Sequence, residues 1–253
     1  MTHLVQPLES GHAILVVPCY NEASRLDLGA IARGIADNPR VAFIFVDDGS
    51  TDATAAVLEE LCNDPLGRLR WKKLARNCGK AEAVRQGVLA ALELRPAMVG
   101  YWDADFSTPL DVVGDYLALL DRDPRLLAVF GSRVRRLGAE VERKPLRHYA
   151  GRIFATVASM VLGIGVYDTQ CGAKLFRVTD AVANAFAEPF SSRWIFDVEL
   201  LARLRREVAP QPLAPLLLEY PLPRWRDVAG SKLTLWHGIA AFGDLWRIAR
   251  KYR

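Results

Sequence analysis

The chain has 253 residues, of which 51% are hydrophobic and 25% charged, and its formal net charge is +4. This length suits one domain with a substantial core, and the composition excludes a disordered or fibrous protein. The small net charge gives no indication of a nucleic-acid partner, so we expect none.

The cysteines and apolar segments indicate neither a secreted nor a membrane-spanning chain. The four cysteines form no Cys-x-x-Cys pair and have no clustered histidines beside them, so we expect a reduced, intracellular protein. The first residues lack the basic and apolar regions of a signal peptide. The longest uncharged run, residues 153–167, is shorter than the roughly 20 residues that span a bilayer.

The first half of the chain alternates apolar runs with segments of helical spacing. We predict strands at residues 13–17, 41–46, 71–74, 98–103 and 126–130. We predict helices at residues 26–35, 81–94 and 110–120, and another that is capped by Ser50 or Thr51 and ends at Leu61. Because the strands are continuous apolar runs, the pattern predicts an α/β fold with a mostly parallel sheet and helices on both faces.

Polar side chains follow these strands at their carboxyl ends, where parallel sheets bind ligands. They are Tyr20, Glu22, Asp47, Asp48, Lys80, Asp103 and Asp105. Each of them alone is explained equally well as a solvated loop residue, but the whole set is not. The Gly-x-Gly-x-x-Gly of a dinucleotide-binding fold is absent from the first turn.

Asp103 and Asp105 follow a buried strand, and residues two apart in a strand share a face. Two carboxylates in such a place need a positive partner, and a divalent cation that carries a diphosphate fits that need. Asp121 and Asp123 have the same spacing but precede Pro124 at a predicted helix end, and we interpret them as a solvated turn.

Three motifs resemble the landmarks of family 2 glycosyltransferases with the GT-A fold: Val17-Pro18-Cys19-Tyr20-Asn21-Glu22, Val46-Asp47-Asp48-Gly49-Ser50-Thr51-Asp52 and Asp103-Ala104-Asp105. The resemblance implies a nucleotide-diphosphate sugar as donor and Mg²⁺ or Mn²⁺ as cofactor. It implies that the base and ribose lie against Pro18, Tyr20, Glu22 and one of Asp47 or Asp48. Asp105, with Asp103 through water and Ala104 between them, would bind the metal on the diphosphate. Lys80 resembles the donor-contacting cation of the family.

The second half resembles the dolichyl- and polyprenyl-phosphate β-glucosyltransferases. Phe130-Gly131-Ser132-Arg133 ends a strand with an arginine that resembles the acceptor-phosphate arginine of the family. Residues 167–176, 193–199 and 230–233, with Trp225, are similar as well, and Gln170-Cys171-Gly172-x-Lys174 favours the glucosyl branch over the mannosyl branch. The chain departs from the family at Ala173, where an aromatic residue is usual, and we find no N-terminal membrane anchor like that of the eukaryotic enzymes.

The acceptor determines which residues catalysis needs. A phosphate monoester is already ionised at pH 7 and requires placement, for which the guanidinium fork suits its oxygens. Arg133 is the first candidate for binding the acceptor phosphate, and Arg147 and Arg152 are further candidates. The alternative interpretation of each is an arginine in a solvated basic loop. A hydroxyl acceptor would need a general base, for which Asp197 or Glu199 is available, although orienting their neighbours is the simpler role. The candidate catalytic residues are Asp103, Asp105, Arg133 and Asp197.

A lipid acceptor also requires contact with a membrane. Residues 133–152 contain seven lysines or arginines and two glutamates, and they overlap an apolar helix predicted at residues 146–162. Such a helix can lie in the interface of an anionic membrane surface. A second stripe, Leu235, Ile239, Phe242, Trp246 and Ala249, has helical spacing; it either does the same or packs on the core, and we favour the core.

We predict one GT-A domain over residues 1–253, with a donor-binding half at about 10–132 and an acceptor-binding half at about 133–253. It would transfer glucose from UDP-glucose, with inversion, to dolichyl or polyprenyl phosphate while bound peripherally to the cytoplasmic face of a membrane. The alternatives are transfer from GDP-mannose and a family 2 enzyme with a hydroxyl acceptor. Of other classes, a nucleotidyltransferase needs a glycine-rich basic loop after the first strand, and residues 18–22 offer none. A non-catalytic nucleotide-sugar-binding module would leave both the acid pair and Arg133 unexplained.

Overall fold

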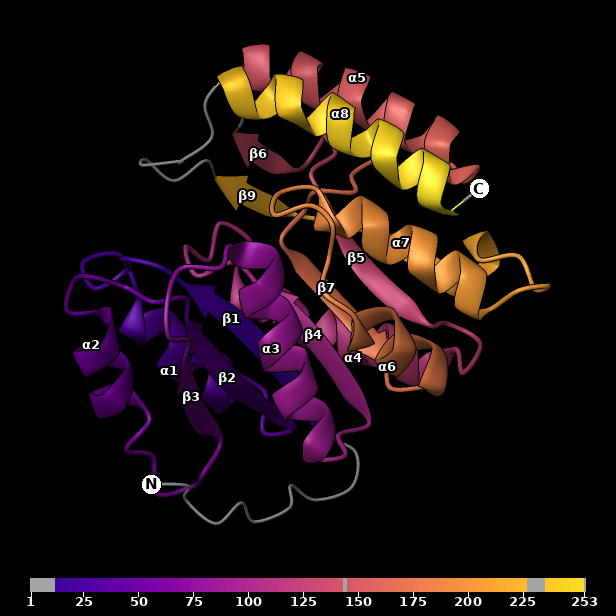
Figure 1. Cartoon of the computed structure of the whole chain (residues 1–253). Coiled ribbons are helices and arrows are strands. Elements are labelled where there is room, and N and C mark those ends of the chain that lie inside the picture. Colours follow the sequence, from indigo (N-terminus) through magenta and orange to yellow (C-terminus); the bar gives the residue numbers. More distant parts are fainter. Residues whose placement is uncertain (1–11, 143–144, 227–234, 253) are drawn as a thin grey trace.

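Seven strands form the central sheet of the structure, a computed structural model that describes residues 12–142, 145–226 and 235–252. The strands are β1 (Ala13–Cys19), β2 (Val41–Asp47), β3 (Leu69–Lys73), β4 (Met98–Trp102), β5 (Ala128–Ser132), β7 (Ala173–Arg177) and β8 (Leu217–Pro221). Their order across the sheet is β3-β2-β1-β4-β7-β5-β8 (Figure 1).

The sheet is mostly parallel, as predicted. β3, β2, β1 and β4 run parallel to one another, and β5 and β8 form a second parallel pair. β7 lies between the two groups and is antiparallel to both β4 and β5, which the sequence did not reveal. The carboxyl ends of β1, β2, β4 and β5 therefore meet the amino end of β7 at one edge of the sheet.

Helices cover both faces of this sheet because alternate strand residues point to opposite sides. Ile14 and Val16 of β1 belong to the core under α3 (Lys80–Glu93), α6 (Asp180–Ala187) and α7 (Phe196–Glu207). Leu15 and Val17 belong to the core under α1 (Leu28–Asp37), α2 (Thr54–Leu61) and α4 (Val113–Arg122). A short 3-10 turn, η1 (Leu110–Val112), leads into α4, and another, η2 (Ala214–Leu216), leads into β8.

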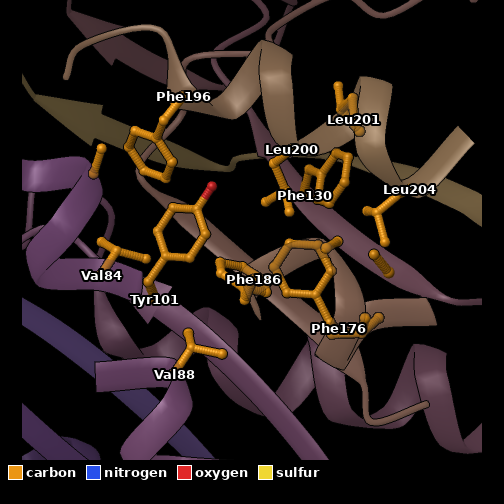
Figure 2. Close-up of a cluster of buried hydrophobic side chains, with 14 of the residues drawn as sticks. Val84, Val88, Tyr101, Phe130, Phe176, Phe186, Phe196, Leu200, Leu201 and Leu204 are labelled. Atoms are coloured by element: carbon orange, nitrogen blue, oxygen red, sulfur yellow. The ribbon is translucent and has the colours of Figure 1, made fainter. Parts of the chain in front are cut away.

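An aromatic cluster fills the space between the sheet and the helices α3, α6 and α7 (Figure 2). Tyr101, Phe130 and Phe176 project from three neighbouring strands toward Phe186 of α6 and Phe196 of α7. The ring centroids of Tyr101 and Phe196 are 5.6 Å apart, a favourable distance for aromatic packing. The hydroxyl group of Tyr101 points toward α7, so this core ends in a polar atom near the start of that helix (Figure 2).

Two long helices, α5 (Pro145–Leu162) and α8 (Leu235–Tyr252), lie side by side beyond α7 (Figure 1). Arg205 of α7 joins their ends, because its guanidinium donates to the carbonyl oxygens of Leu162 at 2.5 Å and Tyr252 at 2.8 Å. Beside them, β6 (Glu140–Glu142) pairs with β9 (Arg224–Arg226) (Figure 1). In the ranges that the structure describes, none of the helices combines the length and hydropathy that crossing a bilayer requires.

The C-terminal helix packs on the core, as we favoured, although Trp246 of the predicted stripe does not take part. Ala241, Leu245 and Ile248 are its buried residues, whereas Trp246 of the predicted stripe is 61% exposed. Successive helical residues are about 100° apart around the axis, so Trp246 faces a different direction from the buried Leu245 before it. The side chains of the other stripe residues Leu235, Ile239 and Phe242 lie outside the described residues.

Candidate functional site

The turns that follow β1 and β2 are joined by hydrogen bonds between their two motifs. The side-chain oxygen of Asn21 accepts from the N–H of Thr51 at 2.9 Å, and the N–H of Asn21 donates to the hydroxyl of Ser50 at 3.0 Å. The N–H of Glu22 donates to the hydroxyl of Thr54 at 2.8 Å. These bonds hold the segment that carries Pro18, Tyr20 and Glu22 against the end of β2.

The same bonds explain why Ser50 and Thr51 do not cap α2, contrary to prediction. The N-cap residue of α2 is Ala53, which offers no capping side chain. The carboxylate of Asp52 instead accepts from the N–H of Thr54 at 3.0 Å. Ser50 and Thr51 are held in the contact with Asn21 and lie too early in the chain to cap the helix.

Asp47 and Asp48 are both buried at the end of β2. Asp48 accepts from the N–H groups of Cys78 and Gly79, at 2.7 and 2.8 Å, and burial raises the pKa of its carboxyl group. Asp47 accepts from the N–H of Ser50 at 2.8 Å through Oδ1, whereas its buried Oδ2 accepts no hydrogen bond from the described residues. Of the pair, Asp47 is therefore the one with an oxygen that accepts no hydrogen bond from the described residues, and Nζ of Lys73 lies 4.0 Å from that oxygen.

Lys80 and Asp103 meet at the carboxyl edge of the sheet. Lys80 is the first residue of α3, and its Nζ lies 2.5 Å from Oδ1 of Asp103, which follows β4. Burial alone would lower the pKa of Lys80, but the negative charges of Asp103 and Asp197 outweigh it and raise that pKa. The side chains of Lys80 and Asp103 are 30% and 38% exposed, so a ligand can reach this charged pair.

Gly172, immediately before β7, determines where the Asp103 carboxylate lies. Its carbonyl oxygen accepts from the N–H of Asp103 at 2.8 Å. A β-carbon at Gly172 would lie 1.9 Å from Oδ2 of Asp103, so only glycine leaves room for the carboxylate. Sequence reasoning placed Gly172 in a family motif but did not assign it to the site, because its contact is across two strands.

The acid pair fits a divalent cation that arrives with a ligand. In the part of the chain that the structure describes, no group of three or more metal-ligating side chains is found. Asp103 and Asp105 alone supply too few oxygens for a tight site, and Mg²⁺ commonly binds through one or two carboxylates together with phosphate oxygens. The ammonium of Lys80 against Asp103 shows that this edge accommodates a cation.

Arg133, one residue after β5, is held by a bidentate ion pair. Its Nε and Nη2 lie 2.6 and 2.7 Å from the two carboxylate oxygens of Asp168, and its guanidinium is 5.3 Å from the ring centroid of Trp225. Burial alone would lower the pKa of Arg133, but Asp168 outweighs it and raises that pKa. With 13% of its side chain exposed, Arg133 is an oriented cation and not a solvated loop residue.

The other two arginine candidates are placed differently. The guanidinium of Arg152 lies 3.7 Å from the ring centroid of Tyr167, the neighbour of Asp168. The carboxylate of Glu219 accepts from the N–H groups of Tyr167 and Asp168, at 2.7 and 2.8 Å, and so fixes the segment between Arg133 and Arg152. The side chain of Arg147 lies outside the described residues.

Asp197 is buried in the first turn of α7, where Lys174 and Tyr101 bind it. Nζ of Lys174 and the hydroxyl of Tyr101 each donate to its Oδ1 at 2.5 Å. Glu199, by contrast, pairs with Arg203 at 2.9 Å and accepts from the hydroxyl of Tyr252 at 2.8 Å, so it anchors α8. Sequence reasoning placed Lys174 in a family motif but gave it no role in the site, although a lysine within the apolar run of β7 indicates a buried partner.

A hollow of about 410 Å³ lies away from all these residues, and Arg125, Arg177, Glu207 and Gln211 are among those that line it. None of the candidate residues lines it, so we place the site at the carboxyl edge of the sheet.

Comparison with known proteins gives matches over most of the chain. The model of the family "Glycosyl transferase family 2" matches residues 14–181. A dolichyl-phosphate beta-glucosyltransferase of Trichomonas vaginalis is 31% identical, with 96% of this chain and 72% of that protein aligned. Those of Drosophila melanogaster and Homo sapiens are 32% and 30% identical, over 94% of this chain and 74% and 75% of their own lengths.

Solved structures resemble this one throughout. Glucosyl-3-phosphoglycerate synthase of Mycobacterium tuberculosis in complex with UDP has a TM-score of 0.67 at 17% identity, over 95% of this chain and 80% of that one. The same synthase with Mn²⁺, UDP-glucose and phosphoglyceric acid has a TM-score of 0.65 at 16% identity, over the same shares. At these identities the likeness shows the fold alone, and it confirms the predicted GT-A fold.

Proposed function

This chain is a member of glycosyl transferase family 2, and we propose that it transfers glucose from UDP-glucose, with inversion, to dolichyl phosphate or a related polyprenyl phosphate. The observation that carries the proposal is the placement of Arg133, an oriented cation, at the same sheet edge as the Lys80–Asp103 pair. The names of the relatives that match most of the chain support glucose and dolichyl phosphate.

In this proposal the donor lies across the ends of β1, β2 and β4. Pro18, Tyr20, Glu22 and Asp47 contact the base and ribose, and Oδ2 of Asp47, which accepts no hydrogen bond from the described residues, supports its choice over Asp48. The diphosphate lies at Lys80, Asp103, Ala104 and Asp105. Lys80 stabilises the negative charge that develops on the leaving diphosphate.

Asp103 and Asp105 would hold Mg²⁺ or Mn²⁺ together with the diphosphate. The bound metal supplies positive charge for the leaving group. The crystal structure of a GT-A neighbour with Mn²⁺ and UDP-glucose supports this choice of cofactor. The residues of this chain orient the diphosphate through Lys80 and position Asp103 through Gly172.

Arg133 holds the acceptor phosphate in this proposal, with Arg152 and Arg147 as further cations. A phosphate monoester needs no general base, because it is ionised at neutral pH. Its oxygen attacks the sugar carbon from the side opposite the diphosphate, which inverts the configuration. The paired state of Asp197 supports a phosphate acceptor, since its Oδ1 already accepts two hydrogen bonds.

The lipid acceptor would be reached at an anionic membrane surface. The outer helices expose large apolar side chains, with Ile153 and Met160 of α5 at 61% and 77% and Trp246 of α8 at 61%. Arg247, Arg250 and Lys251 are exposed on the same stretch of α8. This combination supports peripheral association with the cytoplasmic face of a membrane.

We assign donor and acceptor binding to the two halves of the chain as the sequence predicted, with one change. Donor binding is assigned to about residues 10–132 and acceptor binding to about residues 133–253, but Gly172 and Asp197 of the second half support the donor residues. GDP-mannose as donor and a hydroxyl as acceptor are the rival functions. Family membership disfavours a nucleotidyltransferase or a non-catalytic binding module.

Product analysis tests the proposal. The purified protein is incubated with labelled UDP-glucose or GDP-mannose and either a polyprenyl phosphate or a polyprenol, with Mn²⁺. We expect a glucosylated lipid phosphate of β configuration and none from the polyprenol. Mannosyl transfer alone, or transfer to the polyprenol, would refute it.

A further inference from the structure

A lysine is buried in the centre of the sheet, and no step assigned above uses it. Lys174 lies on β7 with 1% of its side chain exposed, and its strand neighbours Ala173, Leu175 and Phe176 are fully buried. A buried ammonium is strongly unfavourable unless it is paired and hydrogen-bonded. Its position therefore depends on its partners.

The partners of Lys174 join three elements at one oxygen atom. Nζ donates to the carbonyl oxygen of Cys171 and to Oδ1 of Asp197, each at 2.5 Å. The hydroxyl of Tyr101 donates to the same Oδ1, also at 2.5 Å, and the Tyr101 ring centroid is 5.3 Å from Nζ. β4, β7 and the first turn of α7 are thus tied together at Tyr101, two residues before Asp103.

The start of α7 also lies against the start of α3, which carries Lys80. Nε of Arg193, before α7, donates to the carbonyl oxygen of Cys78 at 3.1 Å, and Nη2 of Arg193 donates to the side-chain oxygen of Asn77 at 2.9 Å. A β-carbon at Gly79 would lie 2.7 Å from Nε of Arg193, so the two loops are in close contact. The segment that leads into α7 and the loop that leads into Lys80 are therefore held together by hydrogen bonds.

We propose that Lys174 is a positioning residue that acts through Asp197: it fixes Asp197 and with it the start of α7, which packs against the loop before Lys80, so that Lys80 is in place when the donor diphosphate binds. The inference rests on the proposed function, in which Lys80 contacts the donor. It also removes Asp197 from general-base work. An oxygen that already accepts from an ammonium and a hydroxyl is a poor proton acceptor.

A double-mutant cycle of Lys174→Met and Asp197→Asn tests this inference. Calorimetric titration with UDP in the presence of Mn²⁺ measures the donor site without any acceptor. We expect each single variant to weaken UDP binding on the order of tenfold, within the range for residues in direct contact. The double variant should match Asp197→Asn alone, because Lys174 acts only through Asp197. The KM for polyprenyl phosphate should not change in any of them.

Two further variants distinguish an effect on UDP binding from an effect on folding. Tyr101→Phe removes one hydrogen bond to Asp197 without a change of charge, so it serves if Lys174→Met does not fold; it should weaken UDP binding, but not in the Asp197→Asn background. Arg203→Met is the matched control, since Arg203 is also a buried cation, on α7, paired with Glu199. It should lower the melting temperature and leave UDP affinity unchanged.

Three results would overturn the inference. They are equal weakening by Lys174→Met in the wild-type and Asp197→Asn backgrounds, unchanged UDP affinity in all variants, and loss of turnover in Asp197→Asn with normal UDP affinity. The last would identify a general base. Failure of the proposed function is distinct: the wild-type protein would bind UDP but form no glycosylated lipid phosphate.

Discussion

The carboxylate of Asp103 is held in place by Lys80 and by the segment that contains Gly172. Because a β-carbon at Gly172 would lie 1.9 Å from Oδ2 of Asp103, Gly172→Ala should displace the carboxylate. We expect metal-dependent UDP binding to weaken by roughly 10–100-fold, as for other changes that move a metal ligand. Gly165→Ala is the control, since a β-carbon there meets nothing within 4 Å. Wild-type UDP affinity in Gly172→Ala would contradict the assigned position of Asp103.

Of the acid pair, Asp105 is the residue on which we expect metal binding to depend most directly. Asp105→Ala should abolish turnover and the effect of Mn²⁺ on UDP affinity, while the melting temperature stays near wild type. Asp123→Ala is a matched control from the other Asp-x-Asp, where Asp121 and Asp123 lie in surface ion pairs with Arg40 and Arg125. If Asp105→Ala were as active in the presence of a chelator as the wild-type protein, the metal assignment would be wrong.

At the scale of elements, the docking of α8 on α7 depends on Glu199. Burial alone would raise the pKa of Glu199, but hydrogen bonds from Arg203, Tyr252 and the N–H of Ser191 outweigh it and lower that pKa below 4.5. A lowered pKa stabilises the fold above the unfolded value, and this contribution is lost as the pH falls through the folded pKa.

We therefore expect Glu199→Gln to lower the melting temperature at pH 7 and to have less effect as the pH falls below about 4.5. Thermal melts of both proteins between pH 7 and pH 4 measure the difference. A difference that stays constant with pH would show that the charge of Glu199 does not stabilise this junction.

The pair of outer helices should carry the attachment to membranes. Trp246 is 61% exposed, and the guanidinium of Arg250 lies 4.8 Å from the centroid of its ring. Trp246→Ala with Arg250→Ala should reduce sedimentation with anionic vesicles, and wild-type binding should weaken as salt rises. Leu66→Ala, a change at a 71% exposed leucine before β3, should have no effect. Equal binding to neutral and anionic vesicles at every salt concentration would argue against electrostatic attachment.

For the whole molecule, the features that could be predicted from the sequence are those that depend on residues close together in the chain. β1, β2, β4 and β5 are mainly apolar runs, whereas β3 contains an arginine and two lysines. The polar residues after these strands lie at one edge because parallel strands end together. The place of β7 between β4 and β5 is a choice of pairing partner, which no local pattern encodes.

The same distinction holds within the site. Arg133 was predicted from its motif, but its partner Asp168 is 35 residues away, and Lys174 is 23 residues from Asp197. Such pairs depend on which strands and helices become neighbours. The sequence therefore predicted which residues bear charge at the site but not which of them neutralise one another.

The nucleotide preference belongs to the whole donor site. The resemblance to the glucosyl branch implies a uridine nucleotide, so UDP should bind more tightly than GDP in calorimetric titrations with Mn²⁺. Tighter binding of GDP would move the assignment to the mannosyl branch.

The most direct test of the central claim asks whether a phosphate held by Arg133 is the nucleophile. The measurement is kcat/KM for polyprenyl phosphate at saturating UDP-glucose, in Arg133→Ala and in Lys174→Met/Asp197→Asn, which removes basicity at position 197 without stranding a buried ammonium. Loss of a charge-assisted contact should reduce the first by roughly ten- to a hundredfold. The second should fall by no more than about tenfold, the effect that we expect from displacing Lys80 at the diphosphate. An Arg133→Ala enzyme near wild type, beside a loss of roughly 10²–10⁴-fold in the double variant, would contradict the account, because that pattern belongs to a general base and a hydroxyl acceptor.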